Sequence, residues 1–212
     1  MSLGKRHHSG GEILPILKID ARHGTIYVQT RTLSHGEWVP EQRGIEPSTF
    51  VALFDLEGLE ICWAHFPKGA RPDIIAVPAG QDLPDAPSQD HRQGVRFKLK
   101  LSEANGGGIY ECLSCAVGVW HAMDDLHGAY LAGLVEHPGQ LPIIGIETMV
   151  EHKSKLGSNY APKFKITGWL NRPADLPATA PAATVRKPAP QATAPKLKLA
   201  GPDPFNDEIP WR

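Results

Sequence analysis

Residues 92–101 read RQGVRFKLKL, and their polar and apolar residues alternate more cleanly than in any other stretch of the chain. Successive side chains of a β-strand point to opposite faces, so alternation of this kind predicts a strand with one apolar face and one charged face. The apolar residues are Val95, Phe97, Leu99 and Leu101, and the cations are Arg96, Lys98 and Lys100. One face is therefore expected to join a core, and the other carries a row of positive charges.

Other strand-like runs lie on both sides of this stretch. They are rich in β-branched and aromatic residues and are bounded by turn residues. The expected strands are Ile13–Asp20, Thr25–Leu33, Phe50–Leu56, Leu59–Phe66, Asp73–Val77, Leu141–Val150 and Pro162–Leu170. Residues Asp82–Asp90, with two prolines and three aspartates, are expected to form an exposed loop.

One segment, from Ala116 to Glu136, has a different period. Its large apolar residues recur at spacings of three and four, which is typical of one face of an amphipathic helix. They are Val119, Trp120, Met123, Leu126, Tyr130 and Leu134. Pro138 and Gly139 end the pattern, so a single helix is predicted here.

Several strands, one helix and then two strands resemble the five-stranded oligonucleotide-binding barrel, in which a helix separates the third strand from the fourth. The expected fold is therefore mainly β. It is an antiparallel barrel like the oligonucleotide-binding (OB) barrel, with additional strands and one amphipathic helix, followed by a disordered tail.

The composition divides the chain into four parts. Residues 1–12 are expected to form a flexible N-terminal arm, and residues 13–172 the OB-like domain. Residues 173–200 hold six prolines and nine alanines among 28 residues and no aromatic residue, which predicts a disordered tether. Residues 201–212 (GPDPFNDEIPWR) bring acids and large apolar residues back together and are expected to be a docking tip, although a frayed terminus is the alternative.

The overall charge and the cysteine count limit the classes of protein. The chain of 212 residues has 22 Lys and Arg against 23 Asp and Glu, so a strongly basic coat for duplex DNA is excluded and any nucleic-acid site must be local. No run is apolar enough to span a membrane and no secretory signal is recognised, so the expected location is the cytoplasm. Three cysteines fit reduced thiols better than disulfides.

Cations and aromatic residues also share faces elsewhere. In the last predicted strand Lys163, Lys165, Thr167 and Trp169 are expected on one face, opposite Phe164 and Ile166. Single-stranded nucleic acid suits such a mixture, because cations follow the phosphates while bases stack on aromatic rings. The alternative is the ordinary solvated face of an antiparallel sheet. The predicted nucleic-acid-binding residues, with those of the second strand and the loops, are Tyr27, Arg31, Trp38, Arg96, Lys98, Lys100, Lys153, Tyr160, Lys163, Lys165 and Trp169.

Cys112 and Cys115 form a C-x-x-C pair that precedes His121 and His127. The two histidines are six residues apart, about 120° around a helix at the usual rotation, which suits a shared metal ion poorly. Two small buried thiols are the preferred interpretation, and no metal or other cofactor is expected. No catalytic motif is recognised, so the protein is expected not to be an enzyme. A metal- or thiol-dependent enzyme using Cys112, Cys115 and His121 is the alternative.

The C-terminal tip resembles that of bacterial and phage single-stranded DNA-binding proteins, in which a flexible linker ends in acids followed by Ile-Pro-Phe. Residues 207–210 match the acid-acid-Ile-Pro pattern, and Trp211 stands at the aromatic position. Arg212 then follows, which is a departure from the family pattern. The phage or prophage type is the nearer comparison. The resemblance implies docking to replication and recombination proteins through Phe205, Asp207, Glu208, Ile209, Pro210 and Trp211.

These features together predict a protein that binds and protects single-stranded DNA during replication, recombination and repair, and recruits partners through its tip. No membrane partner is expected, and a homo-oligomer is compatible with the sequence. A protein–protein adaptor or phage accessory factor whose β-domain binds no nucleic acid is the alternative.

Overall fold

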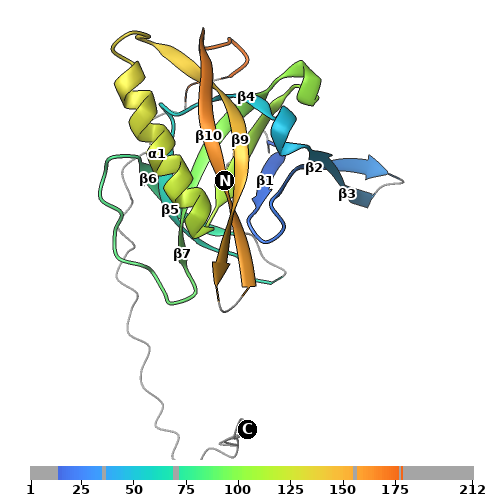
Figure 1. The fold of residues 1–212 in the computed structure, drawn as a ribbon. Helices are drawn as coiled ribbons and strands as arrows, with labels where there is room; N and C mark the ends of the chain where they lie inside the picture. The colour runs from blue at the N-terminus through green and yellow to red at the C-terminus, as the bar shows by residue number, and fades with distance from the viewer. Residues whose placement is uncertain (1–13, 35–36, 69–71, 155–156, 177, 179–212) are drawn as a thin grey trace, which may run out of the picture. The chain divides into compact units, whose positions relative to one another are not determined.

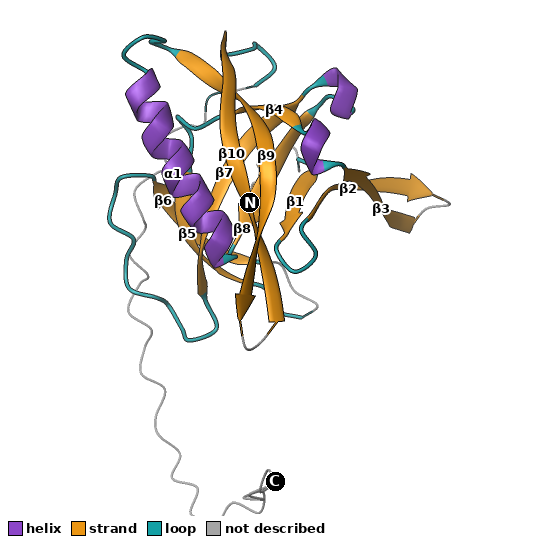
Figure 2. Ribbon diagram, viewed as in Figure 1, coloured by secondary structure: helices purple, strands orange, loops and turns teal. Residues whose placement is uncertain are grey.

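The structure is a computed structural model that describes residues 14–34, 37–68, 72–154, 157–176 and 178. Ten strands, one α-helix and two short 3-10 helices form the described part of the chain (Figures 1 and 2). The predicted N-terminal arm, the docking tip and nearly all of the tether lie outside the described residues.

The fold is mainly β, as predicted. The strands are β1 Ile16–Asp20, β2 Thr25–Ser34, β3 Glu37–Ile45, β4 Val51–Phe54, β5 Glu60–His65, β6 Asp73–Pro78, β7 Arg92–Leu101, β8 Ile109–Ser114, β9 Gln140–Ser154 and β10 Gly157–Asn171. The α-helix is α1 Val117–Gly133, and the 3-10 helices are η1 Pro47–Thr49 and η2 Glu103–Asn105. Strands β3 and β8 were not predicted. Within the described residues, no helix has the length and apolar character needed to cross a membrane.

All ten strands belong to one sheet. Its main order is β10-β9-β4-β7-β8-β1-β2-β3, and β5 pairs with both β7 and β6. Strands β4, β7 and β8 are neighbours in the sheet, α1 follows β8 along the chain, and β9 and β10 form the last hairpin. The predicted arrangement, with a helix between the third and the fourth strand of the barrel-like set, is therefore present (Figure 2).

The sheet is not closed into a barrel, and it is mixed where a purely antiparallel one was expected. One edge of β8 pairs with β7. The other edge pairs with β1, and this second pair is parallel. Because β1 occupies that edge, β10 cannot form a ladder with β8. Instead, one backbone hydrogen bond of 2.6 Å runs from Tyr160 N, in β10, to Ala21 O, just after β1. Strands β2 and β3 extend away from this region as an arm (Figure 1).

The core lies between the sheet and α1. Strand β7 buries Val95, Phe97, Leu99 and Leu101, and its cations lie on the opposite face, so the predicted alternation is confirmed. The helix buries Val119, Met123, Leu126 and Tyr130, which belong to its predicted apolar stripe. We call the sheet face that is covered by α1 the inner face and the opposite one the outer face.

The folded part extends past the predicted boundary at residue 172. Residues 172–176, which we call the strap, leave β10 and pack on the outer face. The side chain of Leu176 has 0% exposure and packs with Leu53 and Leu141 in a small second apolar cluster. Residues 173–176, which were predicted to belong to the tether, thus contact the folded domain, because Leu176 finds an apolar site that strands distant in sequence create.

Candidate nucleic-acid interface

The register of the strands shows which predicted residues share the outer face. Lys98 of β7 lies opposite Glu111 of β8, and Glu111 pairs with Ile16 of β1. Lys18, two residues beyond Ile16, is therefore on the same face, and it lies opposite Tyr27 of β2. Neighbouring strands are about 4.8 Å apart and each residue rises about 3.3 Å, so Tyr27 is displaced from Lys98 by about 14 Å across the strands and about 7 Å along them.

Lys165 of β10 reaches the same face from the other side of β7. Lys165 lies opposite Gly145 of β9, and Gly145 lies opposite Val51 of β4. Two residues further along β4, Leu53 lies opposite Lys100 of β7. The two lysine-bearing strands thus share one face of the sheet, with β9 and β4 between them.

Acidic side chains occupy part of this face. Arg96 donates a 2.8 Å hydrogen bond to Glu111 and lies 3.5 Å from Glu60. The hydrogen bond with Glu111 raises the pKa of Arg96, against the opposing effect of desolvation. Lys100 forms a 2.6 Å ion pair with Asp175 of the strap. Two of the three predicted β7 cations therefore have carboxylate partners.

Other cations of the outer face have no such partner. Within the described part of the chain, Lys18, Lys98 and Lys165 form no ion pair within the 4.0 Å limit. Lys18 and Lys165 are exposed, and Lys98 is partly exposed. These three ammonium groups are the ones available to a phosphate without displacing a carboxylate.

Trp169 does not lie on the face predicted for it. The register of β10 against β9 shifts between Ile166 and Gly168, which is a β-bulge at Thr167. A bulge inserts one residue, so every later side chain turns to the other face. Trp169 therefore points to the inner face, where its ring stacks on the rings of Tyr130 in α1 and of His137. The distances between ring centroids are 5.9 Å and 4.8 Å. The prediction of Trp169 as a stacking residue for a base on the lysine face is wrong.

Two predicted residues line a groove instead. The groove has a volume of about 870 Å³ and lies between α1 and the β9–β10 hairpin. Tyr160 and Lys163 line it together with His121, His152 and Asp125. Lys163 forms a 3.1 Å ion pair with Glu147 of β9. Both residues lie toward the hairpin end of β10, and Lys163 keeps the face of Lys165 because no extra residue of β10 lies between them.

The remaining predicted residues are dispersed. Lys153, in β9, lies 3.7 Å from Glu151. Arg31 lies in β2 and Trp38 in β3, and their side chains fall outside the described part of the structure. Trp38, Lys153 and Tyr160 were expected in loops, but all three belong to strands. The six residues predicted to dock partners, Phe205 and residues 207–211, lie outside the described residues.

The C-x-x-C pair is split between the two faces. Cys112 lies opposite Phe97 in the core and has 0% exposure, and desolvation raises its pKa to about 12. Cys115 lies near Gly94, whose missing side chain would point to the outer face. The two thiols therefore do not share a site. No group of three or more His, Cys, Asp or Glu side chains that suits a metal ion occurs among the described residues.

Sequence reasoning missed four charged residues of the outer face: Lys18, Glu60, Glu111 and Asp175. The alternation of Lys18 between Leu17 and Ile19 was a usable signal. Glu111 was missed because β8 was not recognised as a strand. The partnership of Asp175 with Lys100 spans 75 residues and has no local signal.

Comparison with known proteins adds no assignment: no family model, no curated protein and no solved structure matches this chain.

Proposed function

We propose that this is a non-catalytic, cytoplasmic protein that binds single-stranded DNA on the outer face of its sheet. The observation that carries the proposal is the register, which gives Lys18, Lys98 and Lys165 one common face, with Tyr27 beside Lys18 at the end of the row. Cations along a face hold phosphates, and an exposed ring offers a stacking surface that does not depend on base identity.

The strand arrangement supports the same proposal. In OB folds, the face of the second and third strands and the loops that flank it bind oligonucleotides. Strands β7 and β8 have the corresponding place here, directly before α1. We further propose that the tip at residues 201–212 recruits replication, recombination or repair proteins, as the resemblance of its sequence implies.

The test is a titration of fluorescently labelled oligo-dT with the full chain at low and moderate salt. In the double variant Lys98→Gln/Lys165→Gln we expect about 30-fold weaker binding at low salt, at about 1 kcal/mol for each charge contact near water. The slope of log K against log salt should decrease in magnitude by about 1.4, since each contact with a single strand contributes about 0.7.

The matched control is Lys68→Gln, which removes one cation from the exposed segment after β5. We expect it to change the affinity less than either single substitution on the outer face. Absence of binding by the wild-type protein at low salt would reject the proposal. Equal effects of Lys68 and Lys98 would reject the outer face as the site.

A specific observation favours the alternative of an adaptor whose β-domain binds no nucleic acid. The carboxylates of Glu60, Glu111 and Asp175 lie among the cations of β7. These three carboxylates offset part of the positive charge of the face, which makes it less suited to nucleic acid than its cations alone indicate. Binding of a protein partner, together with no binding of oligo-dT, would support this second function.

A further inference from the structure

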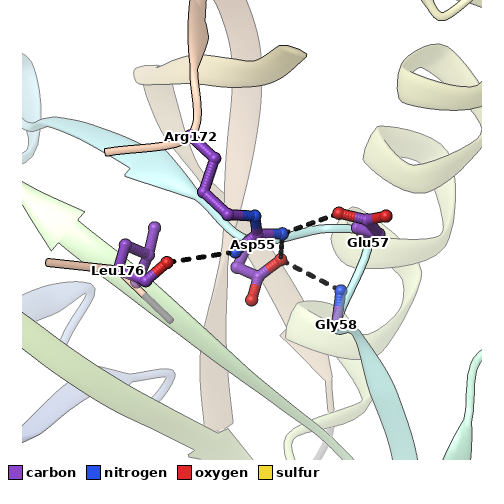
Figure 3. Close-up of polar contacts among 5 residues, drawn as sticks. All are labelled: Asp55, Glu57, Gly58, Arg172 and Leu176. Carbon is purple, nitrogen blue, oxygen red and sulfur yellow. Dashed lines mark hydrogen bonds and ion pairs between the residues drawn. The ribbon is translucent and has the colours of Figure 1, made fainter. Parts of the chain in front are cut away.

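The strap is held to the outer face at its first residue by a buried ion pair. Arg172 donates a 2.7 Å hydrogen bond to Asp55, just after β4, and a 2.8 Å hydrogen bond to Glu57 (Figure 3). The side chain of Asp55 has 0% exposure, and that of Arg172 has 20%. Asp55 also accepts a 3.0 Å hydrogen bond from Gly58 N. This end of the strap is therefore firmly fixed.

The last residue of the strap is fixed as well. Leu176 packs with Leu53 and Leu141, and Ile109 and Ile143 pack against this cluster. Its backbone N–H donates a 3.1 Å hydrogen bond to Pro173 O, which closes the strap into a turn. The backbone of Asp175 is thus held beside β7 by residues on both sides of it.

The side chain of Asp175, by contrast, is held only at the surface. Its carboxylate forms the 2.6 Å ion pair with Lys100, and the two side chains have 57% and 28% exposure. The hydrogen bond from Lys100 keeps the pKa of Asp175 below its usual value, so the carboxylate is charged at neutral pH. Exposed ion pairs of this kind contribute little to stability, so one partner can readily be replaced by another charged group.

We infer that Asp175 is a built-in competitor for the phosphate of single-stranded DNA at Lys100. This inference rests on the function proposed above. The strap holds a carboxylate at the position on β7 where a phosphate would otherwise contact the ammonium group. Nucleic acid then binds by turning the Asp175 side chain away, while Arg172 and Leu176 keep the strap in place. Asp175 therefore weakens binding at one defined contact.

The test compares Asp175→Asn with Asp124→Asn in oligo-dT titrations of the full chain. Both substitutions remove one negative charge, but Asp124 lies on the exposed side of α1 and has no ion pair with the outer face in the described structure. We expect Asp175→Asn to tighten binding about two- to fivefold more than Asp124→Asn does. Its salt slope should increase in magnitude by about 0.7, because Lys100 then contributes as an unpaired contact.

The same substitutions in a Lys100→Ala background identify the contact. There, Asp175→Asn should have no larger effect than Asp124→Asn. Asp175→Ala serves as a second variant, because asparagine can still accept a hydrogen bond from Lys100. A wild-type protein that binds DNA while the Asp175 and Asp124 variants behave alike would reject the competitor and leave the proposed function intact. Absence of binding by every variant would reject both.

Discussion

Substitution of Arg172 by methionine tests how much the strap contributes to the stability of the domain. Methionine keeps most of the length and apolar volume of the side chain but removes both hydrogen bonds to carboxylates. Removing one partner of a buried ion pair costs about 3–5 kcal/mol, because it leaves the other charge buried without compensation. Asp55 keeps the N–H of Gly58 as a donor. The lower end of the range therefore applies, about 3 kcal/mol, and the exposed contact with Glu57 adds little.

Urea unfolding followed by far-UV circular dichroism measures this loss as a decrease in the free energy of unfolding. In a thermal scan the same loss corresponds to a decrease of about 6–12 °C in Tm for a domain of this size. The control Glu57→Gln should cost less than about 1 kcal/mol. Adding Asp55→Asn to Arg172→Met should restore part of the stability, because it removes the uncompensated charge. If Arg172→Met costs no more than Glu57→Gln, the strap is not anchored by a buried pair and the reasoning is refuted.

Two further predictions concern the core. An added Cβ at Gly133 would overlap the ring of Trp169, whereas one at Gly128 meets no atom within 4 Å. Gly133→Ala should therefore lower the free energy of unfolding by about 1–3 kcal/mol, and Gly128→Ala should raise it by up to about 1 kcal/mol. Urea unfolding measures both changes. A more stable Gly133→Ala than Gly128→Ala would contradict the packing of Trp169 on the helix. Cys62 and Cys112 have pKa values raised to about 12, chiefly by desolvation, so neither should react with a thiol reagent at pH 8 until urea is added. Since the fold favours their neutral thiols, stability should also decline as pH rises above about 9, the range in which the unfolded chain loses these protons.

The parts of the fold that follow a local period were predictable from sequence. The alternation of β7 and the helical stripe of α1 each repeat over enough residues to identify the element and its buried face. Strand β8 was missed because it has only six residues, IYECLS, and directly follows three consecutive glycines. Its position in the sheet is set by its pairing with β7 and β1. Strand β3 was missed because Pro40 and its polar residues weaken the pattern, although an edge strand tolerates both.

The faces of individual side chains were less predictable than the strands that carry them. Trp169 would share the face of Lys165 in a regular strand, and the bulge at Thr167 reverses it. The register shift follows from how β10 fits β9 and packs on α1, which alternation along a single strand does not encode. The strap was missed for a related reason. Its composition is that of a tether, but Leu176 is buried by residues of three different strands.

The ion pairs of the outer face lead to a prediction about salt that differs from a simple count of cations. Apart from Lys163, which is paired with Glu147, the register gives this face five cations, Lys18, Arg96, Lys98, Lys100 and Lys165. If all five released a counterion on binding a single strand, the slope of log K against log salt would be about −3.5. A cation that leaves a carboxylate for a phosphate releases no net counterion, because the freed carboxylate attracts a cation from solution. Arg96 and Lys100 are in this position.

The three unpaired lysines therefore set the expected slope of the wild-type protein, about −2. Titration of oligo-dT at four or more salt concentrations measures it directly. A slope near −3.5 would mean that the carboxylates of Glu111 and Asp175 do not hold their partners in solution, and the ion pairs would then have no role in limiting the affinity. A slope near −2 that becomes steeper only when Asp175 is neutralised would link the ion pairs of this face to a defined number of phosphate contacts.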